Sequence, residues 1–230
     1  MITREALEEI IQKKPTIFIL GAGLSTDSGI DDFKHLQSKH NIVGLLSAES
    51  YRQKYWQQHD FISDYLMVKA VPNPAHYWLA KLSHLDTVRL INQNIDSLLE
   101  EAGIRREHIL NIHGSLKKFI DQDRRPVNIS QDEYKQMTEE TGTRNNVRPD
   151  IVLYGEQVRE FPKAISWADQ AEVIVIIGTR LNVFPVNQLA LSGQNMEHMI
   201  IINLDHLNIE STKNVTVDQI NMPISAWLNS

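Results

Sequence analysis

The chain has 230 residues, a formal net charge of -6 and a sequence pI of about 5.8. This length suits a single domain, or one large domain with a small insert, and it allows a sizeable core. The acidic balance argues against nonspecific binding to nucleic acid or to an anionic membrane, and the absence of cysteine excludes disulfides, thiolate metal sites and cysteine nucleophiles.

The N-terminal stretch "MITREALEEIIQKKPTIF" predicts an amphipathic, charged helix that leads into a strand. It lacks the uninterrupted apolar core of a signal peptide, and no run in the sequence reaches the ~20 apolar residues of a membrane-spanning helix. We therefore expect a cytoplasmic protein without a membrane or nucleic-acid partner.

Five short apolar runs, rich in β-branched residues, alternate with helix-like segments. In chain order they are TIFIL (16–20), TVRLI (87–91), HILNI (108–112), EVIVIIG (172–178) and MIIIN (199–203). This alternation predicts an α/β fold with a Rossmann-like, doubly wound parallel sheet that is buried on both faces. Because ligands of such sheets bind beyond the carboxyl ends of the strands, the residues that follow each strand are the functional candidates.

Two regions depart from this alternation and form insertions between strands. Residues 35–71 are polar and aromatic with helical spacing, and residues 116–147 are charged and rich in turn formers. We expect the two insertions to pack together as a small, mainly helical lobe. The large lobe then comprises residues 1–34, 72–115 and 148–230.

The turn after the first strand contains two glycines, in Gly21-Ala22-Gly23. Glycines let the backbone pass close to a ligand, and the start of a following helix would aim free N–H groups at an anion such as a diphosphate. A tight strand-to-helix connection without a ligand explains the glycines equally well. Ser25 does not decide between the two, because serine is an ordinary cap residue.

Polar residues also follow the next two strands. Gln93, Asn94 and Asp96 lie in "INQNIDSLLE", and together amide and carboxylate groups can donate to and accept from a carboxamide. Helix capping by Asn94 or Asp96 is the alternative. His113, in "NIHGS", can titrate near neutrality and could remove a proton from a sugar hydroxyl, although many histidines are merely satisfied polar residues.

Read together, "GAGLSTDSGIDDF", "NQNID" and "IHG" resemble the sirtuin family of NAD-dependent protein deacylases, whose motifs read GAG-x-S-x-x-[SA]-G-I-P-D-F-R, TQNID and HG. The blocks "PNPAHYWLAKL", "RPDIVLYGE", "IGTRLNVFP" and "INLD" also resemble sirtuin blocks in matching order. The resemblance spans nearly the whole chain. It implies one catalytic domain over residues 1–230 that uses NAD to deacylate lysine and releases nicotinamide and O-acyl-ADP-ribose.

The resemblance also implies roles for individual residues. His113 would be the base for a ribose hydroxyl, with Asn94 and Asp96 completing the catalytic set. An acyl-lysine peptide would lie, by strand addition, along Val152, Leu153, Tyr154, Gly155 and Glu156. The residues expected to contact NAD are Gly21, Ala22, Gly23, Ser25, Ile30, Phe33, Lys34, Gln93, Asn94, Asp96, Thr179, Arg180, Asn203 and Gln219.

The sequence departs from the family most clearly in its metal ligands. Sirtuins usually carry four zinc-binding cysteines in the interval that corresponds to residues 116–147, where this chain has neither cysteine nor histidine. We therefore expect no zinc and no other metal. The side chains expected to order the small lobe instead are Phe119, Ile120, Ile129, Tyr134 and Met137.

Other departures concern the chemistry. Asp31 and Lys34 replace the Pro and Arg of the family loop, and lysine keeps the charge without the planar fork of arginine. These changes put acyl-transfer efficiency in doubt more than NAD binding. Arg180 replaces the usual Ser of GTS and could pair with a phosphate. Tyr65 lacks an arginine three positions later, so we expect an uncharged acyl group.

Two other functions keep the NAD site. One is an ADP-ribosyltransferase or NAD glycohydrolase, which the changes at Asp31 and Lys34 favour and a retained His113 disfavours. The other is a non-catalytic NAD or ADP-ribose binding protein, which would not need Asn94, Asp96 and His113 together. A nicotinamide-dependent dehydrogenase is rejected, because Thr26 stands where its fingerprint requires a third glycine.

Overall fold

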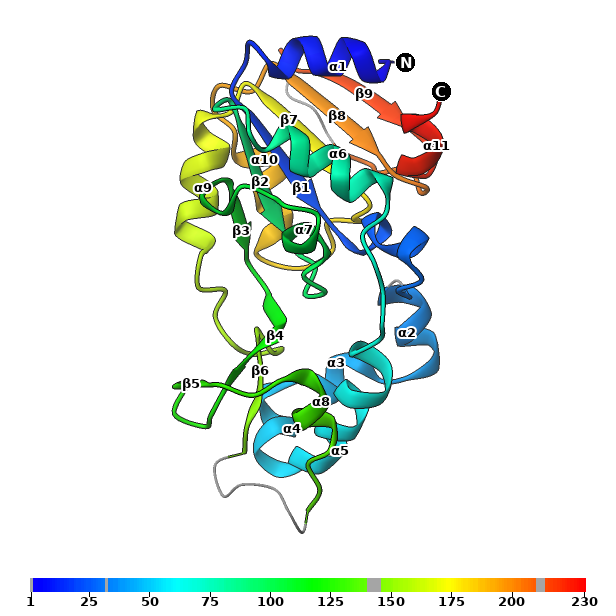
Figure 1. Cartoon of the computed structure of the whole chain (residues 1–230). Helices are drawn as coiled ribbons and strands as arrows, with labels where there is room; N and C mark the ends of the chain where they lie inside the picture. Colours follow the sequence, from blue (N-terminus) through cyan, green and yellow to red (C-terminus); the bar gives the residue numbers. More distant parts are fainter. Residues whose placement is uncertain (1, 32, 140–145, 210–213) are drawn as a thin grey trace.

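A six-stranded parallel sheet forms the centre of the large lobe in the computed structural model, which describes residues 2–31, 33–139, 146–209 and 214–230 (Figure 1). The side chains of Phe33 and Lys34 lie outside this description. The strand order is β3-β2-β1-β7-β8-β9, which confirms the predicted α/β, Rossmann-like fold. The strands are β1 (Thr16–Leu20), β2 (Val88–Asn92), β3 (Ile109–Asn111), β7 (Val173–Ile177), β8 (His198–Ile202) and β9 (Thr216–Ile220).

The parallel register brings the carboxyl ends of the central strands to one edge. Leu20, at the end of β1, pairs with Asn92 of β2 on one side and with Ile177 of β7 on the other. Parallel pairing in this register also continues outward to β3 and to β8 and β9. The loops that carry most of the candidate residues therefore start side by side.

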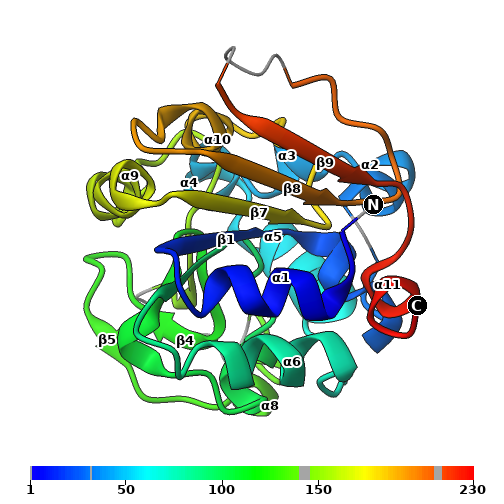
Figure 2. The same cartoon turned by 90° about the horizontal axis from the view of Figure 1, so that it is seen from above.

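Helices cover both faces of the sheet (Figure 2). Phe18 and Leu20 of β1 face a core shared with α1, α6, α7 and α11, whereas Ile17 and Ile19 face a core shared with α9 and α10. This alternation explains why β1 and β7 are buried at every position. The helices are α1 (Arg4–Ile11), α6 (Pro74–Leu82), α7 (Leu98–Glu101), α9 (Phe161–Gln170), α10 (Leu189–Ser192) and α11 (Ile224–Leu228).

The two insertions lie together on the other side of the molecule from α1 (Figure 1). The first is helical, whereas the second also contributes to an antiparallel sheet of order β5-β4-β6, which the sequence analysis did not anticipate. Strand β6 begins at the predicted lobe boundary, residue 148, and pairs with β4. The elements are α2 (Phe33–Lys39), α3 (Ile42–Leu45), α4 (Ala48–Gln53), α5 (Tyr55–Phe61), η3 (Ile62–Leu66), β4 (Gly114–Ile120), β5 (Pro126–Val127), α8 (Gln131–Lys135) and β6 (Arg148–Ile151).

An aromatic core joins the two insertions. Phe119 and Tyr134 pack with Ile62 and Met67 of the first insertion, Ile129 and Met137 lie against this cluster, and Ile120 is buried outside it. Polar contacts reinforce the core. His59 Nε2 lies 2.8 Å from the Tyr134 carbonyl oxygen, and the hydroxyls of Tyr51 and Tyr55 donate to the carbonyls of Asn146 and Val147.

The described residues contain neither a membrane-spanning helix nor a cluster of metal ligands. No helix among them combines the length and apolar character needed to cross a membrane. In the same part of the chain, no three His, Cys, Asp or Glu side chains gather so as to hold a metal ion.

Candidate active site

The glycine turn packs backbone to backbone against the loop after β7. The N–H of Gly21 donates to the Ile177 carbonyl at 3.0 Å, and that of Gly23 donates to the Gly178 carbonyl at 2.8 Å. A Cβ on Gly23 would lie 2.8 Å from Gly178 Cα. The turn continues as two short 3-10 helices, η1 (Ala22–Leu24) and η2 (Thr26–Ser28), and not as the expected α-helix. An anion bound here would therefore contact N–H groups of the turn and not those of an α-helix N-terminus.

Ser25 is the centre of a cluster of polar side chains beyond this turn. Its hydroxyl donates to Asp96 Oδ2 at 2.7 Å and accepts from Asn94 Nδ2 at 3.1 Å. The second amide hydrogen of Asn94 goes to the Gly21 carbonyl at 3.1 Å, so Asn94 Oδ1 is the atom of this amide that can accept from a ligand. Asp96 Oδ1 accepts from the N–H of Leu98, and burial raises the pKa of the Asp96 carboxyl.

His76 completes the cluster, although the sequence analysis assigned it no role. Its Nδ1 accepts from the N–H of Asn73 at 3.2 Å, which leaves Nε2 as the protonated nitrogen, 3.4 Å from Ser25 Oγ. The side chain is fully buried, and burial lowers its pKa to about 4. A neutral His76 therefore supports the serine that contacts both Asn94 and Asp96.

The unfolding free energy should fall as the pH drops from 6.5 towards 4, because unfolded His76 then binds a proton that the folded chain excludes. A pKa of about 4 in place of 6.5 corresponds to roughly 3 kcal/mol. Urea unfolding across this range should show a smaller pH dependence for His76→Gln than for the wild type. Equal pH dependence of the two proteins would contradict this account.

His113 has the geometry of a general base. Its Nδ1 lies 2.9 Å from the Gln93 carbonyl oxygen, to which it donates, so the lone pair of a neutral imidazole is on Nε2. Burial lowers the pKa of His113, which favours this neutral form. Gln93 also donates from Nε2 to Thr179 Oγ1 at 3.2 Å, which connects the loops after β2 and β7.

Hydrogen bonds of the Asn92 side-chain amide fix the loop after β2, which carries Gln93, Asn94 and Asp96. Asn92 Oδ1 accepts from the N–H of Asn94 at 3.1 Å, and Asn92 Nδ2 donates to the Asn94 carbonyl at 3.2 Å. The same Nδ2 donates to Asn111 Oδ1 at 2.8 Å, and Asn111 in turn donates to Glu100. The structure thus brings Gly21, Ser25, Gln93, Asn94 and Asp96 together at one edge of the sheet, with His113 hydrogen-bonded to the same loop.

Comparison with known proteins identifies this arrangement. The family model described as "Sir2 family" matches residues 21–185. The chain belongs to the Sir2 family. It is 30% identical, over 94% of its length and 92% of the relative's, to an NAD-dependent protein deacetylase of Saccharolobus solfataricus. It is 33% identical, over 75% of its length and 77% of the relative's, to an NAD-dependent protein deacylase of Bacteroides thetaiotaomicron.

Solved Sir2 structures share the fold over nearly the whole chain. One, described as the structural basis for the mechanism and regulation of Sir2 enzymes, has a TM-score of 0.82 and 26% identity, and the match covers 96% of this chain and 93% of the other. A complex of Sir2 with p53 peptide and NAD+ has a TM-score of 0.81 at 24% identity and covers 100% and 96% of the two chains.

In this Sir2-family chain, four of the residues expected to contact NAD follow β7 and β8 or lie in β9. Thr179 Oγ1 accepts from the N–H of Leu181, and Asn203 Nδ2 donates to the Asp205 carbonyl at 3.0 Å. Arg180, expected to pair with a phosphate, forms an ion pair with the Asp205 side chain. Gln219 lies apart from the Ser25 cluster, beside His206, in the lining of a separate cavity of about 470 Å³.

The proposed peptide segment of this Sir2-family chain is hydrogen-bonded to the backbone of His113, the expected base. The N–H of Val152 donates to the His113 carbonyl at 2.9 Å. Tyr154 pairs with the first insertion, because its N–H donates to Leu46 and its carbonyl accepts from Ala48. Four of the five N–H groups, those of Val152, Leu153, Tyr154 and Glu156, are thus engaged within the chain. A peptide added as a strand has to pair with the other backbone groups.

A cavity of about 510 Å³ opens between the two lobes. The large lobe contributes Ile30, Asp96 and Leu98 to its wall, and the small lobe contributes residues 66–70 and the first turn of α8. Asp96 therefore lies both in the Ser25 cluster and on the cavity wall. The expected contacts of Phe33 and Lys34 with NAD fall on side chains outside the described part of the chain.

Proposed function

We propose that this Sir2-family protein is an NAD-dependent protein-lysine deacylase that releases nicotinamide and O-acyl-ADP-ribose. The observation that carries the proposal is the placement of His113. Its Nδ1 donates to the Gln93 carbonyl, in the loop that also carries Asn94 and Asp96, and its Nε2 is therefore unprotonated. Relatives named NAD-dependent protein deacetylase and deacylase support it. A pure binding protein would not need a base fixed in this tautomer.

In the proposed reaction, some residues would bind and orient NAD and the peptide, and His113 would transfer a proton. Bound NAD would supply the glycosidic bond that is broken. Asn94 Oδ1 would accept a hydrogen bond from a polar group of NAD, and the turn at Gly21 and Gly23 would receive the NAD diphosphate. His113 Nε2 would take the proton of a ribose hydroxyl that captures the acyl group. Residues Val152 to Glu156 would hold the acyl-lysine peptide next to that base.

A product assay tests the proposal. The protein is incubated with NAD and an acetyl-lysine peptide, beside a reaction without peptide, and the products are identified by mass spectrometry. Deacetylated peptide and O-acetyl-ADP-ribose are the expected products. Free ADP-ribose formed equally without peptide would identify an NAD glycohydrolase, the alternative favoured by Asp31 and Lys34. Modified protein carrying ADP-ribose would identify a transferase.

Chelators should leave the protein unaffected. We expect the proposed enzyme to be zinc-independent, because side chains of Tyr51, Tyr55 and His59 contact the backbone of the interval in which sirtuins carry their zinc-binding cysteines. Excess EDTA or 1,10-phenanthroline is therefore expected to change neither the Tm nor the rate of O-acetyl-ADP-ribose formation. A drop in Tm reversed by added zinc would contradict this expectation. Tyr55→Phe, which removes one of the three contacts, should lower the Tm with or without chelator.

A further inference from the structure

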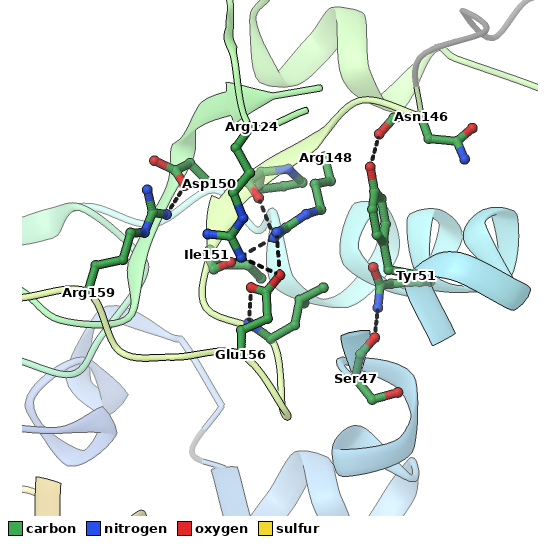
Figure 3. Close-up of polar contacts among 12 residues, drawn as sticks. Ser47, Tyr51, Arg124, Asn146, Arg148, Asp150, Ile151, Glu156 and Arg159 are labelled. Atoms are coloured by element: carbon green, nitrogen blue, oxygen red, sulfur yellow. Dashed lines mark hydrogen bonds and ion pairs between the residues drawn. The ribbon is translucent and has the colours of Figure 1, made fainter. Parts of the chain in front are cut away.

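A half-exposed arginine on the β4–β5 hairpin reaches the proposed peptide segment (Figure 3). Arg124 Nη2 lies 2.7 Å from Glu156 Oε1, and Arg148 Nη2 lies 2.8 Å from the same oxygen. The side chains of Glu156 and Arg148 are 14% and 4% exposed, whereas that of Arg124 is 44% exposed. Arg148 therefore supplies the buried half of the cluster, and Arg124 closes it from the solvent side.

The Glu156 carboxylate in turn shapes the peptide segment. Its Oε2 accepts from the N–H of Leu153 at 3.0 Å, and the N–H of Glu156 donates back to the Leu153 carbonyl at 2.9 Å. Gly155 has a φ of 90° at the third position of this turn, as a type II turn requires. The side chain and main chain of Glu156 thus close one tight turn over residues 153–156.

The hairpin around Arg124 is itself fixed. Asp121 Oδ1 accepts from the N–H groups of Asp123 and Arg125, at 2.9 Å each, and the Asp121 carbonyl accepts from the N–H of Arg124 at 3.0 Å. Asp121 is buried, and Arg124 has the left-handed φ of 64°. The backbone of Arg124 is therefore held in one conformation, which lowers the entropic cost of directing its side chain at Glu156.

We propose that Arg124 is a positioning residue for the acyl-lysine peptide. By completing the charge cluster on Glu156, it holds the turn over residues 153–156 in the shape that receives the peptide, without contacting NAD or the reacting atoms. This role rests on the proposed deacylase function. It predicts that loss of Arg124 weakens peptide binding selectively, because the Ser25 cluster and His113 share no hydrogen bond with this arginine in the described chain.

Steady-state kinetics of Arg124→Ala, Arg124→Lys and Arg125→Ala test the inference. Arg124→Ala should raise the KM for an acetyl-lysine peptide roughly fivefold, the scale of one partly exposed ion pair, with kcat and the KM for NAD within twofold of the wild type. Arg124→Lys, which keeps the charge, should recover part of the loss. Arg125→Ala is the matched control, because Arg125 is exposed on the same hairpin and its side chain pairs with Asp123.

The outcomes separate this inference from the function on which it rests. A wild type that forms O-acetyl-ADP-ribose, with an unchanged peptide KM in Arg124→Ala, would overturn the role of Arg124 alone. A fall in kcat together with both KM values would do the same, since it would indicate a general structural role. A wild type that forms no O-acetyl-ADP-ribose would overturn the deacylase function and the inference with it.

Discussion

Replacement of His113 by alanine is expected to reduce acyl transfer by about 10²- to 10⁴-fold, the usual contribution of a general base. The imidazole is fixed by its hydrogen bond to the Gln93 carbonyl, and burial lowers its pKa, so at neutral pH the wild type presents a neutral Nε2. The rate of O-acetyl-ADP-ribose formation and the Kd for NAD from calorimetry check this. NAD binding should stay nearly intact.

His84→Ala is the control for His113→Ala, because His84 is an exposed histidine in the turn that follows α6. This control should leave both the rate and the Kd unchanged. Undiminished deacetylation in His113→Ala would remove the assignment of the base. A parallel loss of NAD binding would show instead that His113 shapes the cofactor site.

Gly114→Ala is expected to destabilise the fold by about 3 kcal/mol or more and to abolish activity. Gly114 has a φ of 86°, and a Cβ at this position would lie 2.0 Å from the Asp150 carbonyl oxygen. Because that oxygen belongs to the backbone of β6, the new methyl group can fit only if β4 and β6 separate next to His113. Urea unfolding and the product assay measure the two effects.

Gly103→Ala isolates the cost of the backbone conformation. Gly103 has a comparable φ of 90°, but nothing lies within 4 Å of its Cβ position. Its replacement should cost only about 1 kcal/mol, the penalty of a left-handed backbone at a residue with a side chain. Equal losses in Gly103→Ala and Gly114→Ala would show that the clash with β6 is not the decisive term.

The sheet was predictable because its central strands are buried on both faces. Val173–Ile177 is apolar throughout, and four consecutive apolar residues follow His198 in His198–Ile202, as strands buried on both faces require. Strand β9 (Thr216–Ile220) was missed, since it lies at the sheet edge and only Ile220 in it is fully buried. Strand β6 was missed because its sequence, RPDI, contains a proline and its pairing with β4 depends on a distant segment.

The candidate site also contains residues that the sequence predicted and one, His76, that it did not. Gln93, Asn94, Asp96 and His113 follow strands of a parallel sheet, so topology alone directs them to one edge. His76 follows no strand, and its contact with Ser25 joins residues 51 positions apart. Its signal in the sequence is the pattern Asn73-Pro-Ala-His76, a helix start in which the histidine ring caps the Asn73 N–H. This pattern predicts that His76 caps the helix, but it does not predict the contact between His76 and Ser25.

The hydrogen bond from Val152 to His113 has a consequence for motion. It joins the proposed peptide segment to the backbone of His113, the proposed base, and β4 and β6 continue that pairing away from the site. His113 Nδ1 also donates to the Gln93 carbonyl, so the segment is connected through His113 to the loop after β2 in the large lobe. Asn94 of that loop donates in turn to the Gly21 carbonyl, so a rotation of the lobes that keeps these bonds leaves the spacing between residue 152 and the glycine turn unchanged.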